Sequence, residues 1–139
     1  MQDTNENRVA HLEMVQGVII RMGTNSFLLK GWSVTLVAAL FALASVDSRQ
    51  ELALLALLPA IVFWGLDAYY LRQENLFCEL HDGIREAPLG TLKGTFSMDT
   101  KPYEIKVDSL FATIRTPTLV AFHAVITVAV IIGIIVLAS

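Results

Sequence analysis

The sequence contains few of the residues on which soluble enzymes and nucleic-acid-binding proteins depend. Charged residues make up 17% of its 139 residues, and 10 Lys and Arg residues are set against 13 Asp and Glu residues. Basic residues this few and dispersed argue against a large nucleic-acid surface. With one cysteine and three histidines there is no Cys/His cluster with metal-site spacing. We interpret Cys78 as a small buried apolar residue, with palmitoylation as the alternative.

Catalytic motifs are also missing. The chain has no nucleophile elbow, no His-Glu metal motif, no paired carboxylates within an apolar run and no inverted repeat of the transporter type. Its first 26 residues are polar and lack the basic and short apolar regions of a cleavable signal peptide. We therefore expect a protein that is not an enzyme, holds no cofactor or metal, and retains its first apolar segment.

Long apolar runs are what the sequence does contain. Residues 27–46, 52–71 and 119–138 each have the length of about 20 residues that spans a hydrocarbon core. Apolar residues make up 55% of the chain, and the mean hydropathy is +0.60. These features predict an all-α integral membrane protein with three transmembrane helices in a lipid bilayer.

Helical periodicity extends beyond the first two runs. Apolar residues recur at helical spacing between residues 12 and 22 and again between residues 76 and 84. Because only residues 47–51 connect the two runs, we expect residues 1–86 to form a long antiparallel hairpin extended into the cytosol. The glycine at the start of residues 23–25 predicts a kink in the first helix.

The remaining chain divides into a loop, residues 87–117, and a third transmembrane helix, residues 118–139. The loop is too small for a core of its own, and we expect it to pack against the hairpin, with a short helix or strand in its second half. Gly90 and Gly94, beside several hydroxyls, are either a structural turn or a phosphate-binding loop of low specificity. The apolar loop residues that favour packing are Phe96, Met98, Tyr103, Leu110 and Phe111.

Lys and Arg residues are distributed unevenly. Six of them lie between the second and third runs, whereas the connection between the first two runs carries only Arg49. Positive residues near membrane segments stay on the cytoplasmic side. The N-terminus and the loop are therefore predicted to be cytoplasmic and the C-terminus to lie outside.

Two charged residues interrupt the apolar runs. Lys30 lies 19 residues before Arg49 and Asp67 lies 18 residues after it, so the helical rise places both about 28 Å below the outer connection. That depth is the inner interface of a core about 30 Å thick. Either the two residues form an ion pair that sets the hairpin register, beside an aromatic belt, or they belong to an ion pathway or gate.

His123 and Pro59 are the other irregular residues within the runs. His123 lies roughly 8 Å inside the third run, and we expect it near Ser33, Thr35 and Trp64. A membrane histidine usually faces other helices and bonds to a hydroxyl or carbonyl, and a proton-sensing or pore-lining role is the alternative. Pro59 predicts either a packed kink or a hinge used in gating.

Two stretches resemble a known family. RMGTNSFLLKGWSVTLVAAL at residues 21–40 and PAIVFWGLDAYYLRQE at residues 59–74 are similar to the SLATT-type membrane proteins encoded beside bacterial anti-phage systems. The resemblance covers roughly residues 8–86, with residues 96–99 as a weaker third block. The signature positions that it implies are Asn25, Lys30, Trp32, Trp64, Asp67 and Tyr70.

This resemblance implies an effector or accessory of nucleotide-sensing defence in the bacterial inner membrane. We expect a homo-oligomer that forms a pore or perturbs the membrane, with Lys30, Asp67 and His123 tuning the gate. The signal would be a cyclic or modified nucleotide or a soluble defence protein on the cytosolic face. Because the chain has no appended sensor domain, a partner is expected to supply it. The alternatives are a non-conducting scaffold or regulatory subunit that recruits a soluble defence enzyme complex, and a small housekeeping transporter or channel.

Overall fold

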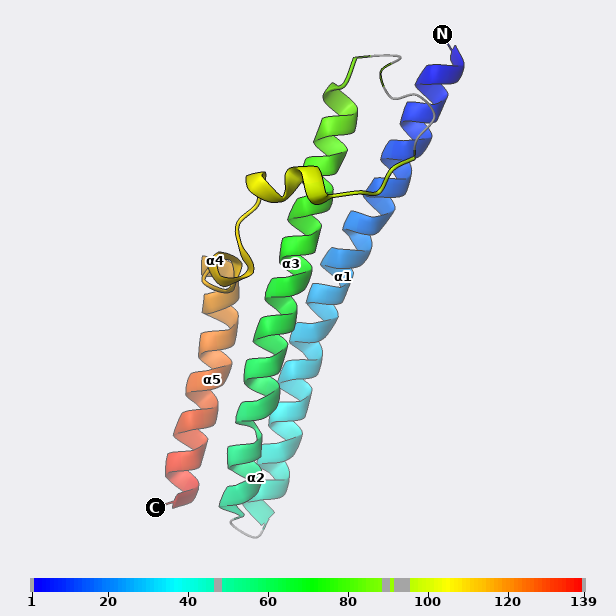
Figure 1. Cartoon of the computed structure of the whole chain (residues 1–139). Helices are drawn as coiled ribbons and strands as arrows, with labels where there is room; N and C mark the ends of the chain where they lie inside the picture. Colours follow the sequence, from blue (N-terminus) through cyan, green and yellow to red (C-terminus); the bar gives the residue numbers. More distant parts are fainter. Residues whose placement is uncertain (1, 47–48, 89–90, 92–95, 139) are drawn as a thin grey trace.

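Three long helices dominate the computed structural model, which describes residues 2–46, 49–88, 91 and 96–138 (Figure 1). The elements in chain order are α1 Gln2–Val46, α2 Gln50–Leu55, α3 Leu57–Glu86, the 3-10 helix η1 Lys101–Lys106, α4 Leu110–Ile114 and α5 Pro117–Ala138. The described residues include no strand, so the all-helical prediction is confirmed. Gly90 and Gly94, the predicted turn or phosphate-binding loop, lie outside the described residues.

Three helical segments are long and apolar enough to cross a membrane: residues 5–46, 50–86 and 117–138. Their outer faces carry large apolar side chains; Phe27, Ile61 and Val125, one from each segment, are 75%, 62% and 68% exposed. Continuous apolar surface of this kind is rare on soluble monomers. The length and the surface of these helices are compatible with a multi-pass membrane protein.

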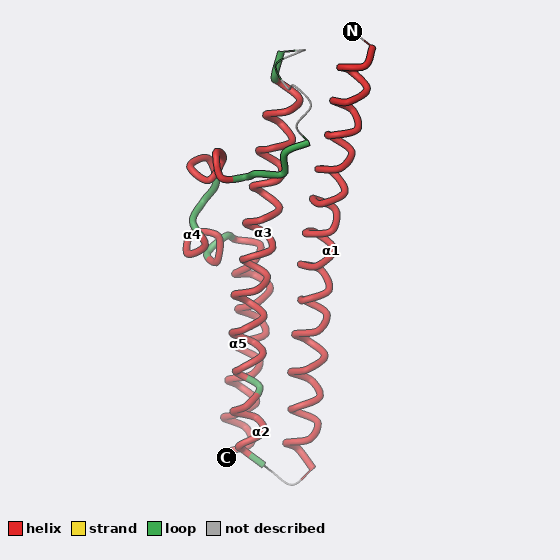
Figure 2. Tube along the Cα trace, turned by 45° about the vertical axis from the view of Figure 1, so that its right-hand side comes forward, coloured by secondary structure: helices red, strands yellow, loops and turns green. Residues whose placement is uncertain are grey.

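α1 and α3 lie side by side and run in opposite directions (Figures 1 and 2). α5 covers only the half of α3 that lies nearer α2, so the other half of α3 and the beginning of α1 project beyond it. Two apolar cores hold the bundle together. One contains Val15, Leu80 and Ile84, and the other contains Val37, Ala56, Ala60 and Val130.

α1 continues as a helix through residues 23–25, where the sequence predicted a kink. The side chain of Thr24 donates to the carbonyl of Ile20, at 2.8 Å, within the same helix. Gly23 faces Glu74 of α3 at ordinary contact distance, because a Cβ there would lie 3.6 Å from Glu74 Oε2. Gly23 therefore lies at the contact between α1 and α3, within a continuous helix.

The effect of Pro59 appears one turn earlier, at Ala56. Proline has no N–H, and its ring crowds the carbonyl four residues before it, which is that of Leu55. α2 ends at Leu55, and the N–H of Ala56 donates instead to Ala53 at 3.2 Å. Ala56 is fully buried in the core with Val37. Ala56 keeps helical backbone angles, with φ −65° and ψ −19°, so the proline produces a local irregularity in the helix that is tightly packed in this structure.

Residues 96–116 form a strap that crosses α3 and leads into α5 (Figure 1). The segment predicted to be a short helix or strand is helical, as η1 and α4. Met98 and Tyr103 pack against the core around Val15 and Leu80. Leu110 and Phe111, which were predicted to pack in the same way, are 40% and 78% exposed.

Candidate functional site

A buried carboxylate in the middle of α3 is the centre of a group of polar side chains. Asp67 has no exposed surface. An ionised group in apolar surroundings is tolerated only when other groups pair with it. Asp67 is bonded by Ser26 and Lys30 of α1 and by His123 of α5. We call these four residues the polar cluster.

Lys30 contacts both oxygens of Asp67. Its Nζ lies 2.8 Å from Oδ1 and 2.6 Å from Oδ2. It also donates to Ser26 Oγ at 2.8 Å, and that hydroxyl donates to Asp67 Oδ1. Ser26 and Lys30 reach the same carboxylate because residues four apart lie on one face of a helix. The two charges that the sequence places at one depth are therefore in contact, and the Lys30 side chain remains 26% exposed.

His123 brings the third long helix into the cluster. Its Nε2 lies 2.9 Å from Asp67 Oδ2, and both side chains are completely buried. A carboxylate can only accept a hydrogen bond, so Nε2 is the protonated nitrogen and donates. The sequence predicted a hydroxyl or carbonyl as the partner of His123, and the structure shows a carboxylate.

Aromatic rings enclose the imidazole. Trp64 is stacked on His123 with ring centroids 5.8 Å apart and an interplanar angle of 9°. Phe122 approaches edge-on at 5.1 Å. Trp64 is thus beside His123, as the sequence suggested, whereas Thr35 is exposed and donates to Gly31 within its own helix. The two rings therefore pack against the imidazole of a completely buried pair.

Two buried polar atoms in the described part of the chain have no hydrogen-bond partner: Ser33 Oγ and His123 Nδ1. Ser33 follows Lys30 by one turn and is fully buried. A buried polar atom without a partner costs about 1–3 kcal/mol. A buried polar atom without a partner in a native structure calls for an explanation, and one possible explanation is a functional role.

Trp64 also links the cluster to the strap. Its Nε1 donates to the carbonyl of Ile114 at 3.1 Å, while its ring is stacked on His123. Sequence reasoning missed this link, because neither the path of the strap nor the direction of the Trp64 side chain can be derived from periodicity.

The other predicted signature positions lie outside the cluster. Trp32 is 59% exposed on α1. Tyr70 meets Tyr69 edge-on, with ring centroids 5.6 Å apart. Asn25 is partly buried on α1, next to Ser26 in the chain. Of the six signature positions, the structure brings together Lys30, Asp67 and Trp64.

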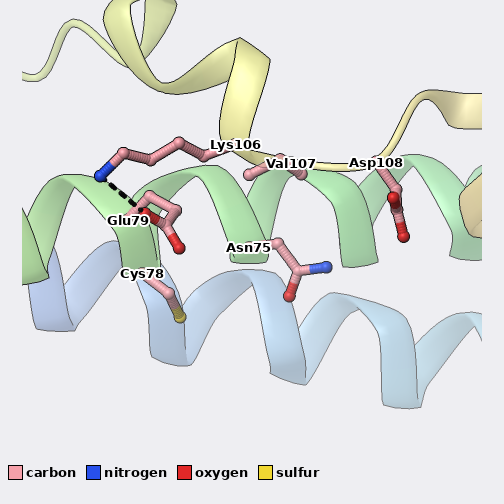
Figure 3. A pocket seen from close by; sticks show the side chains of 6 residues that line it. All are labelled: Asn75, Cys78, Glu79, Lys106, Val107 and Asp108. Carbon is pink, nitrogen blue, oxygen red and sulfur yellow. Dashed lines mark ion pairs between the residues drawn. The ribbon is translucent and has the colours of Figure 1, made fainter.

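A shallow hollow of about 250 Å³ lies between the strap and α3 (Figure 3). Lys106, one of its lining residues, pairs with Glu79 at 3.5 Å. Burial, followed by the nearby carboxylate of Glu74, raises the pKa of the Cys78 thiol in its wall. The residues that line the hollow are Asn75, Cys78, Glu79, Lys106, Val107 and Asp108.

Within the described ranges, no three His, Cys, Asp or Glu side chains are grouped so that they could hold a metal ion. Comparison of the chain with protein-family models, with curated proteins and with solved structures gave no match.

Proposed function

We propose that this chain is a multi-pass protein of the bacterial inner membrane that acts as an oligomeric effector or accessory of anti-phage defence. In this proposal the polar cluster controls the opening of a pathway through the membrane. The observation that carries it is that one buried carboxylate, Asp67, bonds side chains from both other long helices. Any relative movement of the three helices must break or remake these bonds.

The proposed orientation places the N-terminus and the strap in the cytosol and the C-terminus outside. The distribution of Lys and Arg supports it, because most of them lie in the first part of α1 and between α3 and α5. The half of α1 and α3 that extends beyond α5 would then form the cytosolic end of an antiparallel hairpin. Lys30 and Asp67 would lie at the inner interface.

A role in gating is supported by the energetics of the cluster. Ionisable residues in membrane segments are costly, usually face the interior of a bundle and mark ion pathways or switches. A buried ion pair adds little net stability compared with apolar residues of similar size, yet breaking one is expensive. The polar cluster therefore suits a switch between two packed states better than it suits a stabilising element.

A conduction path would form between copies of the chain, because three helices are too few to surround a channel. α5 offers an outward face of β-branched residues, with Val125 and Ile132 being 68% and 55% exposed. Gly133 is used within the chain, because a Cβ there would overlap the Phe41 ring of α1. Val125 and Ile132 are therefore better candidates than Gly133 for contacts between subunits.

The hollow in Figure 3 argues against direct nucleotide recognition at that position. Its walls carry the carboxylates of Glu79 and Asp108, and its one lysine, Lys106, is already paired with Glu79. Nucleotide phosphates bind where backbone amides and cations converge. This surface would repel them.

Ion flux through liposomes that contain the purified, inserted protein tests the proposal. We expect Asp67→Asn to change flux, and toxicity in cells, without abolishing expression. Asp82→Asn is the matched control, because it removes the same charge from α3 at a side chain that is 51% exposed, where ion pairs contribute little. Unchanged flux and toxicity in inserted Asp67→Asn protein would count against a role in gating.

The same assay with a panel of cyclic and linear nucleotides separates the sources of the signal. Flux that depends on a nucleotide would establish direct gating. Constitutive flux would support a pore controlled by a partner. Absence of flux from inserted oligomers would refute the pore.

The second candidate function is a non-conducting scaffold or regulatory subunit. Ile105 favours it, because this apolar side chain on the strap is 94% exposed. In the proposed orientation this side chain would face the cytosol, where it is accessible to a protein partner. Co-purification of a soluble defence enzyme encoded beside this chain, and its loss in Ile105→Ser, would support the scaffold. Retention of that enzyme by Ile105→Ser would exclude this surface as the contact.

A further inference from the structure

The strap follows a single face of α3. Tyr103 lies over Gly83, where a Cβ would overlap its ring. Further along, Lys106 pairs with Glu79, Arg72 Nε donates to the Asp108 carbonyl at 3.0 Å, and Trp64 Nε1 donates to Ile114. The α3 positions 83, 79, 72 and 64 recur at helical spacing, so they form one stripe. The strap therefore runs beside α3 from near its C-terminal end to the polar cluster.

The N-terminal end of the strap, at Phe96 and Ser97, is attached to α1. His11 Nε2 lies 2.9 Å from the Ser97 carbonyl, and the His11 ring meets Phe96 edge-on at 5.6 Å. His11 is only 5% exposed. Arg8 donates to the carbonyl of Ala87, where α3 has just ended.

The C-terminal end of the strap, which leads into α5, is connected to the cluster in two ways. Trp64 donates to Ile114 of the strap, and its ring stacks on His123, which bonds Asp67. In addition, α5 begins at Pro117, directly after the strap, so the helix that carries His123 is its covalent continuation. A displacement of the strap would move both the ring that covers His123 and the first turn of α5.

The ion pair that attaches the strap to α3 is weak compared with the bonds inside the cluster. Lys106 and Glu79 are 58% and 35% exposed, and ion pairs this open to solvent contribute little. Met98 and Tyr103 are its apolar anchors on the core around Leu80. Segments with few buried contacts open at low free energy, and such segments supply the moving parts of regulated proteins.

We propose that the strap is an autoinhibitory clamp that holds Trp64 against His123 and keeps the polar cluster closed until a cytosolic protein partner displaces it. This inference rests on the proposed function and names how that site is regulated. The partner would bind the exposed side of the strap around η1. Displacement of the strap would then release His123 from Asp67.

The test displaces the strap at Gly83, far from the cluster, and observes Trp64. The chain has two tryptophans, so Trp32→Phe leaves Trp64 as the only indole. In that background Gly83→Leu fills the space that the Tyr103 ring occupies, whereas the matched Gly17→Leu enters open space, because no atom lies within 4 Å of a Cβ there. Both variants replace a glycine in a long helix with leucine, so they differ only in what surrounds the new side chain.

We expect the fluorescence emission of Trp64 to shift in Gly83→Leu and not in Gly17→Leu, for protein in lipid nanodiscs. In liposomes, Gly83→Leu should raise basal flux about tenfold relative to Gly17→Leu, the size of effect that overpacking at one contact produces on a two-state equilibrium. Lys106→Met loosens the same strap without added volume. It should shift the emission in the same direction by a smaller amount.

Equal Trp64 emission in Gly83→Leu, Lys106→Met and Gly17→Leu would overturn the inference, whatever the flux. An emission shift without flux in any variant, Asp67→Asn included, would retain the coupling between strap and cluster and would refute the proposed pore. Fluorescence and flux thus judge the two proposals separately.

Discussion

Removing the charge of Asp67 should destabilise the bundle and alter its function together. Asp67→Asn keeps the size of the side chain but leaves Lys30 without its counter-ion. Breaking a buried ion pair costs about 3–5 kcal/mol. The Lys30 side chain is 26% exposed and its amine can move toward water, so we expect about 2–3 kcal/mol, or a 30- to 150-fold change in an equilibrium constant.

Removing the charge of Lys30 should destabilise the bundle more than removing the charge of Asp67. Lys30→Met leaves the completely buried Asp67 carboxyl without its ammonium partner, bonded only by Ser26 and His123, so the loss should approach the full cost of about 5 kcal/mol. The double variant Lys30→Met/Asp67→Asn removes both charges. Because uncharged replacements of a buried pair are close to neutral, its stability should return toward that of the wild type.

Thermal unfolding in detergent, followed by helical circular dichroism, measures the stability of these variants, and liposome flux measures their function. The reasoning predicts a double variant that is stable but has altered flux. A double variant as unstable as Lys30→Met would refute the charge argument. If stability and normal flux return together, the cluster only sets the register of the helices and is not a gate.

Two other substitutions and one chemical modification probe contacts outside the polar cluster. Gly133→Ala should lower the unfolding temperature, because the new methyl group overlaps Phe41 and such overpacking costs about 1–3 kcal/mol. Trp64→Phe keeps an aromatic ring on His123 but removes the donor to Ile114, which should cost about 1 kcal/mol and increase proteolysis of the strap. Alkylation of Cys78 should be slow at neutral pH and should accelerate only above the ordinary thiol pKa, because burial raises the pKa of this thiol and the thiolate is the reactive form.

Each of these three predictions has a control. Gly65→Ala adds a methyl group where no atom lies within 4 Å, so its unfolding temperature should stay above that of Gly133→Ala. Trp32→Phe removes an exposed indole and should leave the strap resistant to protease. Cys78 in denaturant should react at the rate of an ordinary thiol. A native rate equal to the denatured rate would contradict the effect of burial.

The sequence alone was sufficient for the helical class, the three long apolar helices and the matching level of Lys30 and Asp67 along α1 and α3. Each of these follows from quantities that the chain carries locally: run length, hydropathy and a constant rise per residue. The same locality explains why the sequence predicts an irregularity at Pro59, either a packed kink or a hinge, but does not give its position. A proline acts on the carbonyl one turn before it, and the irregular turn lies at Ala56, which is buried in the core with Val37.

The partner of His123 was decided only by the tertiary structure. α5 is apolar on every side, so no pattern in its sequence indicates which face points toward Asp67. Its rotation is set instead by Gly133 against Phe41 and by the strap that leads into it. Contacts between segments far apart in the chain depend on these packing choices, and for that reason the link from Trp64 to the strap, and with it the regulation that we propose, appeared only in three dimensions.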